Sequence, residues 1–131
     1  MRSETSFVLD GDLIVVDAVV VGPSGRAQLR LVLDTGAVLT AFVPGVAQAI
    51  GYTSNDRVAW SVVRTAAANE RGYIAQLGHI TTVGFTVPDL HVVIAELGHG
   101  IDGVLGMNFL SDFNFEIRPA ERVVLVERIA P

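Results

Sequence analysis

Residues 26–37 have the sequence RAQLRLVLDTGA, in which an alternating strand runs into a short polar motif. With the period of 2 that strands have, one face carries Ala27, Leu29, Leu31 and Leu33, and the other carries Arg26, Gln28 and Arg30. Asp34-Thr35-Gly36 then ends the strand with an ionisable side chain, a hydroxyl and a glycine that permits a tight turn. A tripeptide of this composition occurs by chance in roughly a few per cent of chains this long, so alone it indicates only a turn.

Short apolar runs rich in Val and Ile, separated by turn residues, fill the rest of the chain and predict eight or nine strands. Two short helices are expected, from Pro44 to Ile50 and from Met107 to Ser111. Residues 65–71 are expected to form the loop tip of a long hairpin, and Asp10-Gly11-Asp12 to form a turn before the first strand. The predicted strands cover residues 13–21, 26–33, 58–64, 72–80, 85–87, 90–96, 113–117 and 122–128. The pattern predicts one all-β, barrel-like or sandwich-like domain over residues 1–131, with a core of about residues 13–127.

Composition excludes several classes of protein. The chain has 131 residues, no Cys and a formal net charge of −5, and its nine basic residues are all Arg. Disulfide frameworks, Cys nucleophiles and Schiff-base lysines are therefore excluded, and a nucleic-acid partner is not expected. No apolar stretch is long enough to predict a membrane segment. We expect a soluble protein, with the lack of Cys favouring a cytoplasmic over a secreted location.

Other candidate residues have simpler interpretations. His79, His91 and His99 match no metal-ligand spacing, so no metal and no cofactor are expected. Asp102 could be a second carboxylate for Asp34, but a turn residue before Val104 is the favoured interpretation. Trp60 is expected to pack within a hairpin rather than to offer a stacking surface.

A second motif gives the Asp34 tripeptide its context. Val104-Leu105-Gly106 has two apolar residues and a glycine, followed by Asn108 at the start of a predicted short helix. The order of the two motifs, with a predicted hairpin between them, resembles retropepsin-like (retroviral-type) aspartic proteases, and most of all their bacterial single-domain relatives. The resemblance covers about residues 13–127 and implies an acid-protease barrel in which two subunits form one active site.

The resemblance implies a role for each residue of the first motif. Asp34 would be the catalytic aspartate, and Thr35 would bond across to the active-site loop of the partner. Gly36 would present its carbonyl to the substrate backbone, while Ala37 and Val38 would line the substrate pocket.

The second motif and the hairpin receive roles in the same way. The hairpin tip, residues 65–72, would be a flap that closes over the substrate through Ala67, Ala68 and Asn69. The active-site loop would be supported from below by Val104, Leu105 and Gly106, and Asn108 would tie the following helix to nearby backbone.

The chemistry implied by the resemblance requires two copies of the chain. Peptide hydrolysis by aspartates needs one carboxylate as a base on water and a second as a proton donor to the scissile carbonyl. The sequence has one Asp-Thr-Gly, so a homodimer is expected, acting on an extended peptide or unfolded protein. The dimer edges are expected to come from the N- and C-terminal strands, with Val123–Ile129 apolar enough to be buried between the subunits.

Departures from the retroviral pattern keep an alternative open. Val38 and Met107 stand where retroviral enzymes have an ion-paired Asp and Arg, and Glu70 stands where bacterial relatives often have Gly. A catalytically weak or inactive retropepsin-like module for dimerisation or peptide binding is therefore the second hypothesis. The third is an unrelated small barrel with a chance tripeptide.

Overall fold

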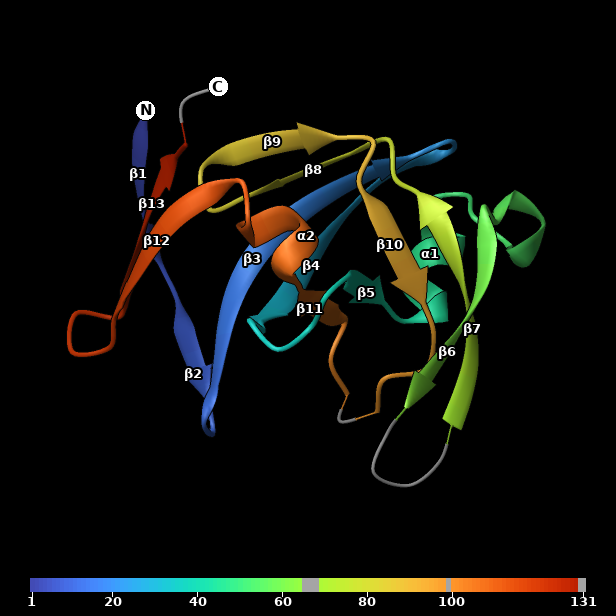
Figure 1. Ribbon diagram of the computed structural model, residues 1–131, viewed down its shortest axis with the longest axis horizontal. Coiled ribbons are helices and arrows are strands. Elements are labelled where there is room, and N and C mark those ends of the chain that lie inside the picture. Colours follow the sequence, from blue (N-terminus) through green and yellow to red (C-terminus); the bar gives the residue numbers. More distant parts are fainter. Residues whose placement is uncertain (65–68, 99, 130–131) are drawn as a thin grey trace.

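The computed structural model describes residues 1–64, 69–98 and 100–129, and it is almost entirely β-structure (Figure 1). The two helices expected from the sequence are confirmed as α1 (Pro44–Ala49) and α2 (Met107–Leu110), and a 3₁₀ turn, η1, covers Ser54–Asp56. Within the described residues, no helix has both the length and the hydrophobicity to span a bilayer. The strands are β1 (Arg2–Ser6), β2 (Val8–Asp10), β3 (Leu13–Gly22), β4 (Gly25–Leu33), β5 (Thr40–Phe42), β6 (Ala59–Arg64), β7 (Asn69–Gln76), β8 (His79–Thr82), β9 (Phe85–Pro88), β10 (His91–Ile94), β11 (Gly103–Leu105), β12 (Phe113–Arg118) and β13 (Val123–Arg128).

The strands form one large sheet and one small one. The large sheet has the order β6-β7-β10-β5-β11-β4-β3-β8-β9, with β2 paired to β3, and the small sheet has the order β1-β13-β12. Figure 1 shows the small sheet at one end of the molecule and the β6–β7 hairpin at the other. This arrangement confirms the all-β prediction.

The centre of the large sheet determines where the first motif lies. β11 runs between β4 and β5, parallel to β4 and antiparallel to β5. The loop from Asp34 to Leu39, which connects β4 to β5, must therefore pass over the end of β11. Because β11 leads into the second motif, this crossing brings the two motifs together.

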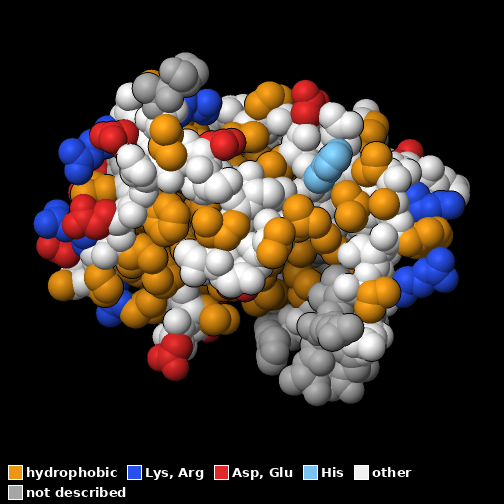
Figure 2. Space-filling view, in the orientation of Figure 1, with side chains coloured by type: hydrophobic (Ala, Val, Ile, Leu, Met, Phe, Trp, Pro, Cys, Tyr) orange, Lys and Arg blue, Asp and Glu red, His pale blue; other side chains and the backbone are white. Residues whose placement is uncertain are grey.

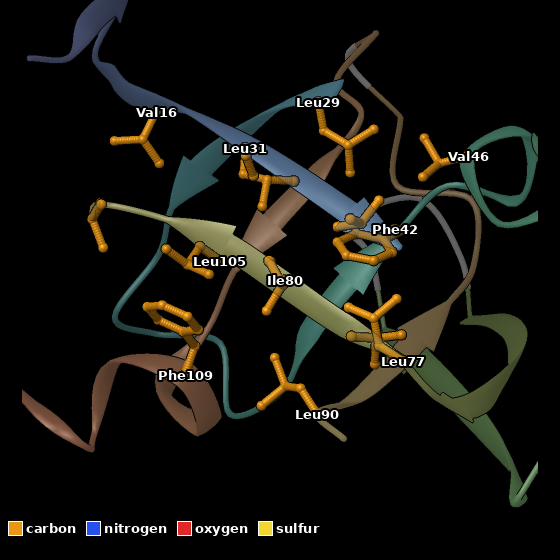
Figure 3. Close-up of a cluster of buried hydrophobic side chains, with 14 of the residues drawn as sticks. Val16, Leu29, Leu31, Phe42, Val46, Leu77, Ile80, Leu90, Leu105 and Phe109 are labelled. Atoms are coloured by element: carbon orange, nitrogen blue, oxygen red, sulfur yellow. The ribbon is translucent and has the colours of Figure 1, made fainter. Parts of the chain in front are cut away.

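One face of the large sheet covers the main hydrophobic core (Figure 3). Leu29 and Leu31 of β4 are buried there, as their alternation predicts, beside Phe42 of β5 and Leu105 of β11. Phe109 of α2 closes the same cluster. Burying each of these large side chains contributes about 1.5–3 kcal/mol, so the core fixes the strands that carry the motifs.

The opposite face of the central strands carries a smaller apolar cluster, which we call the apolar floor. Its members are the buried Ala41, Val93 and Ala95 and the half-buried Leu39, Ile74, Leu97 and Val104. Ala41, Val93 and Val104 each alternate along a strand with a residue of the main core, such as Phe42, which explains why two clusters form on two faces.

The hairpin strands differ from the sequence prediction. β7 begins at Asn69, so the predicted loop of residues 65–71 is too long, and residues 65–68 lie outside the described part. The predicted strand 72–80 is also wrong, because the chain turns between Gln76 and His79. At this turn, the Tyr52 hydroxyl donates to the Gln76 carbonyl (2.9 Å) and accepts from the Gly78 amide (3.1 Å). Burial raises the pKa of this Tyr52 hydroxyl.

The N-terminal segment contains two strands that the sequence pattern did not predict. β1 and β2 precede the Asp10-Gly11-Asp12 turn, which was expected before the first strand. β1 has only polar residues and is stabilised by pairing with β13, while β2 has three residues, all exposed, so neither shows the apolar pattern of a buried strand.

β13 lies in the middle of the small sheet, with β1 on one side and β12 on the other. Its Val124 and Val126 are buried within the chain, and the free edges of the small sheet are those of β1 and β12. A dimer contact through the N- and C-terminal strands stays a prediction.

Candidate active site

Asp34 lies directly after β4, where three hydrogen bonds, two through its backbone and one through its carboxylate, fix its position. Its amide donates to the Leu105 carbonyl (3.0 Å), which joins the first motif to the second. Its carboxylate Oδ1 accepts from the Gly36 amide (2.9 Å), and the Asp34 carbonyl accepts from the Ala37 amide (3.2 Å). The side chain is half-buried, so the loop holds one carboxylate oxygen while the group stays accessible to solvent.

The second motif lies against the same loop. The Ala37 carbonyl accepts from the Met107 amide (2.8 Å), and the Val38 carbonyl accepts from the Asn108 amide (3.0 Å). The first turn of α2 thus uses its free amides to hold the loop carbonyls. The loop is attached to the second motif by backbone bonds, which do not require the ionic side chains that Val38 and Met107 replace.

Asn108 connects three segments through its side chain. Its Oδ1 accepts from the Thr40 amide (2.8 Å) and from the Thr40 hydroxyl (2.9 Å), and its Nδ2 donates to the His91 carbonyl (2.7 Å). The Thr40 Oγ1 also accepts from the Gly106 amide (3.0 Å). Thr40 is fully buried at 0% exposure, and this network satisfies its hydroxyl.

Replacing Asn108 with Ala is expected to lower the free energy of unfolding by about 3 kcal/mol. The Thr40 amide and hydroxyl would lose their acceptor in a buried place, and the His91 carbonyl would lose its donor. Urea unfolding measures the loss, with Asn114→Ala as the matched control because Asn114 is exposed on β12. Equal stability of the two variants would contradict the network's role.

The surface around Asp34 is apolar and open. Val38 is 78% exposed, and Thr35 and Gly36 are also exposed. A Cβ on Gly36 would meet only the Asp34 carboxylate, at 3.2 Å, and its φ is not in the left-handed region. Backbone conformation therefore does not require glycine at position 36, but a side chain there would press on the Asp34 carboxylate, because 3.2 Å is shorter than an ordinary van der Waals contact.

The apolar floor adjoins this loop. Leu39 belongs to the loop itself, and Val104 immediately precedes Leu105, whose carbonyl holds the Asp34 amide. Ala41, Val93 and Ala95 at its centre are buried, and the half-buried Leu39 and Val104 are its parts next to Asp34.

Several predicted site residues lie elsewhere or outside the described part. Ala67 and Ala68 are outside the described residues, while Asn69 begins β7 and is exposed. Asp102 has its own contact, because its carboxylate accepts from the Arg30 amide (2.9 Å) and so fastens the segment before β11 to β4. Among the described side chains, no group of three or more His, Asp or Glu is placed to hold a metal ion.

Sequence reasoning missed Thr40, the central residue of the polar network. Its signal was a hydroxyl residue within the apolar run Leu39–Val43, directly after the Asp34 loop. A buried polar residue needs a partner, and Asn108 was the available amide in the second motif.

Comparisons with known proteins agree with this geometry. A family model described as aspartyl protease matches residues 16–109, which is more than two-thirds of the chain. The fold is similar to a retropepsin-like aspartic protease from Rickettsia conorii, with a TM-score of 0.74, 19% identity, and coverage of 98% of this chain and 92% of that one.

A second similar structure is EIAV protease complexed with the inhibitor HBY-793. Its TM-score is 0.61 at 15% identity, and the match covers 80% of this chain and 93% of that one. A search of curated proteins finds no match. The fold is therefore retropepsin-like, and the chain belongs to the aspartyl protease family.

Proposed function

We propose that this protein is an aspartic endopeptidase that acts as a homodimer, with Asp34 of each subunit supplying one catalytic carboxylate. The observation that carries the proposal is the Asp34 loop. Its backbone is fixed by Leu105, Met107 and Asn108, yet its outer surface, including Val38, is exposed. A rigid carboxylate loop with an uncovered apolar surface suits a second copy related by a two-fold axis.

The reaction uses the pair of carboxylates as one unit. Two carboxyl groups in close contact cannot both ionise, so the pair shares one proton. The ionised Asp34 takes a proton from water, whose oxygen attacks the scissile carbonyl carbon, while the protonated Asp34 of the other subunit gives its proton to the carbonyl oxygen. Proton transfer to the amide nitrogen then allows the C–N bond to break, leaving a carboxylic acid and an amine.

The substrate is an extended peptide or an unfolded protein segment. Gly36 would offer its carbonyl to the substrate backbone, a close approach for which the missing Cβ leaves space. Ala37 and Val38 would contact substrate side chains, together with the apolar floor. Asn69, with Ala67 and Ala68, would contact the substrate from the hairpin side.

The test is cleavage of an unfolded protein from acidic to neutral pH at several concentrations of the full chain. We expect activity per chain to rise with concentration until the dimer is complete, and to be greatest at acidic pH, where the pair keeps one proton. Sedimentation measured on the same samples gives the fraction of dimer.

The two readouts separate the parts of the proposal. Activity that follows the dimer fraction supports the shared site. Full activity from a sample that sediments as a monomer would overturn it, and a dimer without cleavage at any pH would favour the peptide-binding alternative.

A further inference from the structure

The outer face of the β6–β7 hairpin carries a second exposed surface, separate from the apolar floor. Ile74 of β7 packs on the floor, and its partner across the hairpin is Ala59. The next pair, Trp60 and Tyr73, therefore points to the opposite face, where Tyr73 is half-buried against the main core and Trp60 is exposed. Whatever this outer face binds does not compete with the floor for the same side chains.

Three apolar side chains, one just before β6 and two within it, lie in a row beside this face. Val58, Trp60 and Val62 occur at every second position and are 57%, 48% and 64% exposed. A hollow of about 400 Å³ lies beside them, lined by Trp60, Ser61, Val62, Asn69 and Arg71. Three large apolar side chains in one exposed row are typical of an interaction surface.

Two arginine side chains lie over Trp60 in this row of apolar side chains. The guanidinium carbon of Arg57 lies 4.2 Å from the centre of the Trp60 ring, and that of Arg71 lies 4.1 Å from it. The right-hand edge of Figure 2, over β6 and β7, shows basic side chains beside hydrophobic ones. Stacking on an indole holds a guanidinium in place while its N–H groups remain able to donate.

Neither Arg57 nor Arg71 forms an ion pair among the described side chains, where the ion pair found joins Arg118 to Glu116. Arg57 gives one N–H to the Ser54 carbonyl (2.8 Å), and the nearby Asp56 carboxylate accepts from the Thr53 amide (2.8 Å). Burial, and after it the charge of Asp56, raises the pKa of the hydroxyl of Tyr73, the partner of Trp60 across the hairpin. Two guanidinium groups therefore stand against one described carboxylate here, a positive surplus that would attract further carboxylates.

The backbone of β6 adds a third feature. In the described sheet β6 is the edge strand, with β7 as its neighbour on one side and no strand on the other. Edge strands in natural proteins are usually shielded, and an unshielded one accepts an added strand. The free edge lies beside the apolar row and the two guanidinium groups.

We propose that the outer face of this hairpin binds an extended acidic peptide segment, added along β6, with its carboxylates on Arg57 and Arg71 and its apolar side chains against Trp60 and Val62. This binding goes beyond the proposed peptidase reaction, because Arg57, Trp60 and Arg71 have no role in that reaction. Asn69, which also lines the hollow, is the residue that both sites would touch.

Trp60 gives a direct readout, because it is the only tryptophan of the chain. The Asp34→Asn chain, in which cleavage is blocked, is titrated with the blocked seven-residue peptide Glu-Ser-Val-Ser-Glu-Ser-Val, which presents Glu and Val on one face of a strand, and the Trp60 emission is followed. The anisotropy of a dye-labelled copy of the peptide gives a second measure. We expect a saturable change in both, weakened by salt, and at least about tenfold weaker binding of the peptide with Lys in place of Glu.

A double variant, Arg57→Gln with Arg71→Gln, should weaken the binding seen by anisotropy at least about tenfold. Arg26→Gln, which removes an exposed arginine at the start of β4, is the matched control and should bind as before. No binding of the Glu peptide at millimolar concentration, equal binding of the Lys peptide, or unchanged binding by the double variant would each overturn the proposal.

Discussion

The Asp34→Asn variant is expected to lose peptide cleavage by about 10³-fold or more while folding as before. An amide cannot take a proton from water, so a dimer of the variant lacks the base. The fold should persist because the Asn side chain keeps the oxygen that accepts from the Gly36 amide, and because the Leu105 and Ala37 contacts of this loop use backbone atoms. Initial rates of cleavage of an unfolded protein measure the loss of activity, and thermal unfolding measures whether the fold persists.

A mixing experiment tests whether each active site needs two copies of Asp34. Wild-type chains incubated with a threefold excess of the variant should show about one quarter of their activity per wild-type chain, since most then pair with a variant. Asp112→Asn is the matched control, because it makes the same chemical change at an exposed position outside the loop. Activity per wild-type chain that is unchanged by the excess of Asp34→Asn would contradict the shared site.

The large elements of the fold could be predicted because burial marks them in the sequence. β3 and β4 alternate or run apolar over nine or ten residues, and Pro44 and Gly51 mark the limits of α1. β1 could not be predicted in this way, since its residues are polar and its partner β13 is more than a hundred residues away. The same long-range pairing places β13 between β1 and β12 within the chain.

The candidate site could be predicted only where one residue type implies one chemistry. Asp34 and Gly106 stand out in sequence because a carboxylate and a glycine each interrupt an apolar run. Thr40 did not stand out, because its importance comes from burial beside Asn108, which only the crossing of β4, β5 and β11 creates. Trp60 was expected to pack in the hairpin, and its exposure between two arginines follows from the edge position of β6.

Gly106→Ala is expected to lower the free energy of unfolding by about 3 kcal/mol and to reduce cleavage further than the loss of folded protein explains. Gly106 has φ −100° and ψ −177°, which any residue can adopt, so backbone conformation does not require glycine. Space does, because a Cβ would lie 2.7 Å from the Leu39 carbonyl carbon and oxygen and 2.8 Å from the Thr40 amide nitrogen. These are main-chain atoms of the segment that follows Asp34, so the clash cannot be relieved by rotating a side chain.

The direction of that clash explains why cleavage should suffer more than stability. The Gly106 amide donates to the Thr40 hydroxyl, and the preceding Leu105 carbonyl holds the Asp34 amide, so pushing Leu39 away from Gly106 also moves the catalytic loop. Gly45→Ala is the matched control: a Cβ there meets nothing within 4 Å, and alanine favours helix α1 by up to about 1 kcal/mol. Urea unfolding and cleavage rates at equal folded concentration compare the two variants. If Gly106→Ala were as stable and active as Gly45→Ala, the packing of the second motif against the Asp34 loop would not control the site.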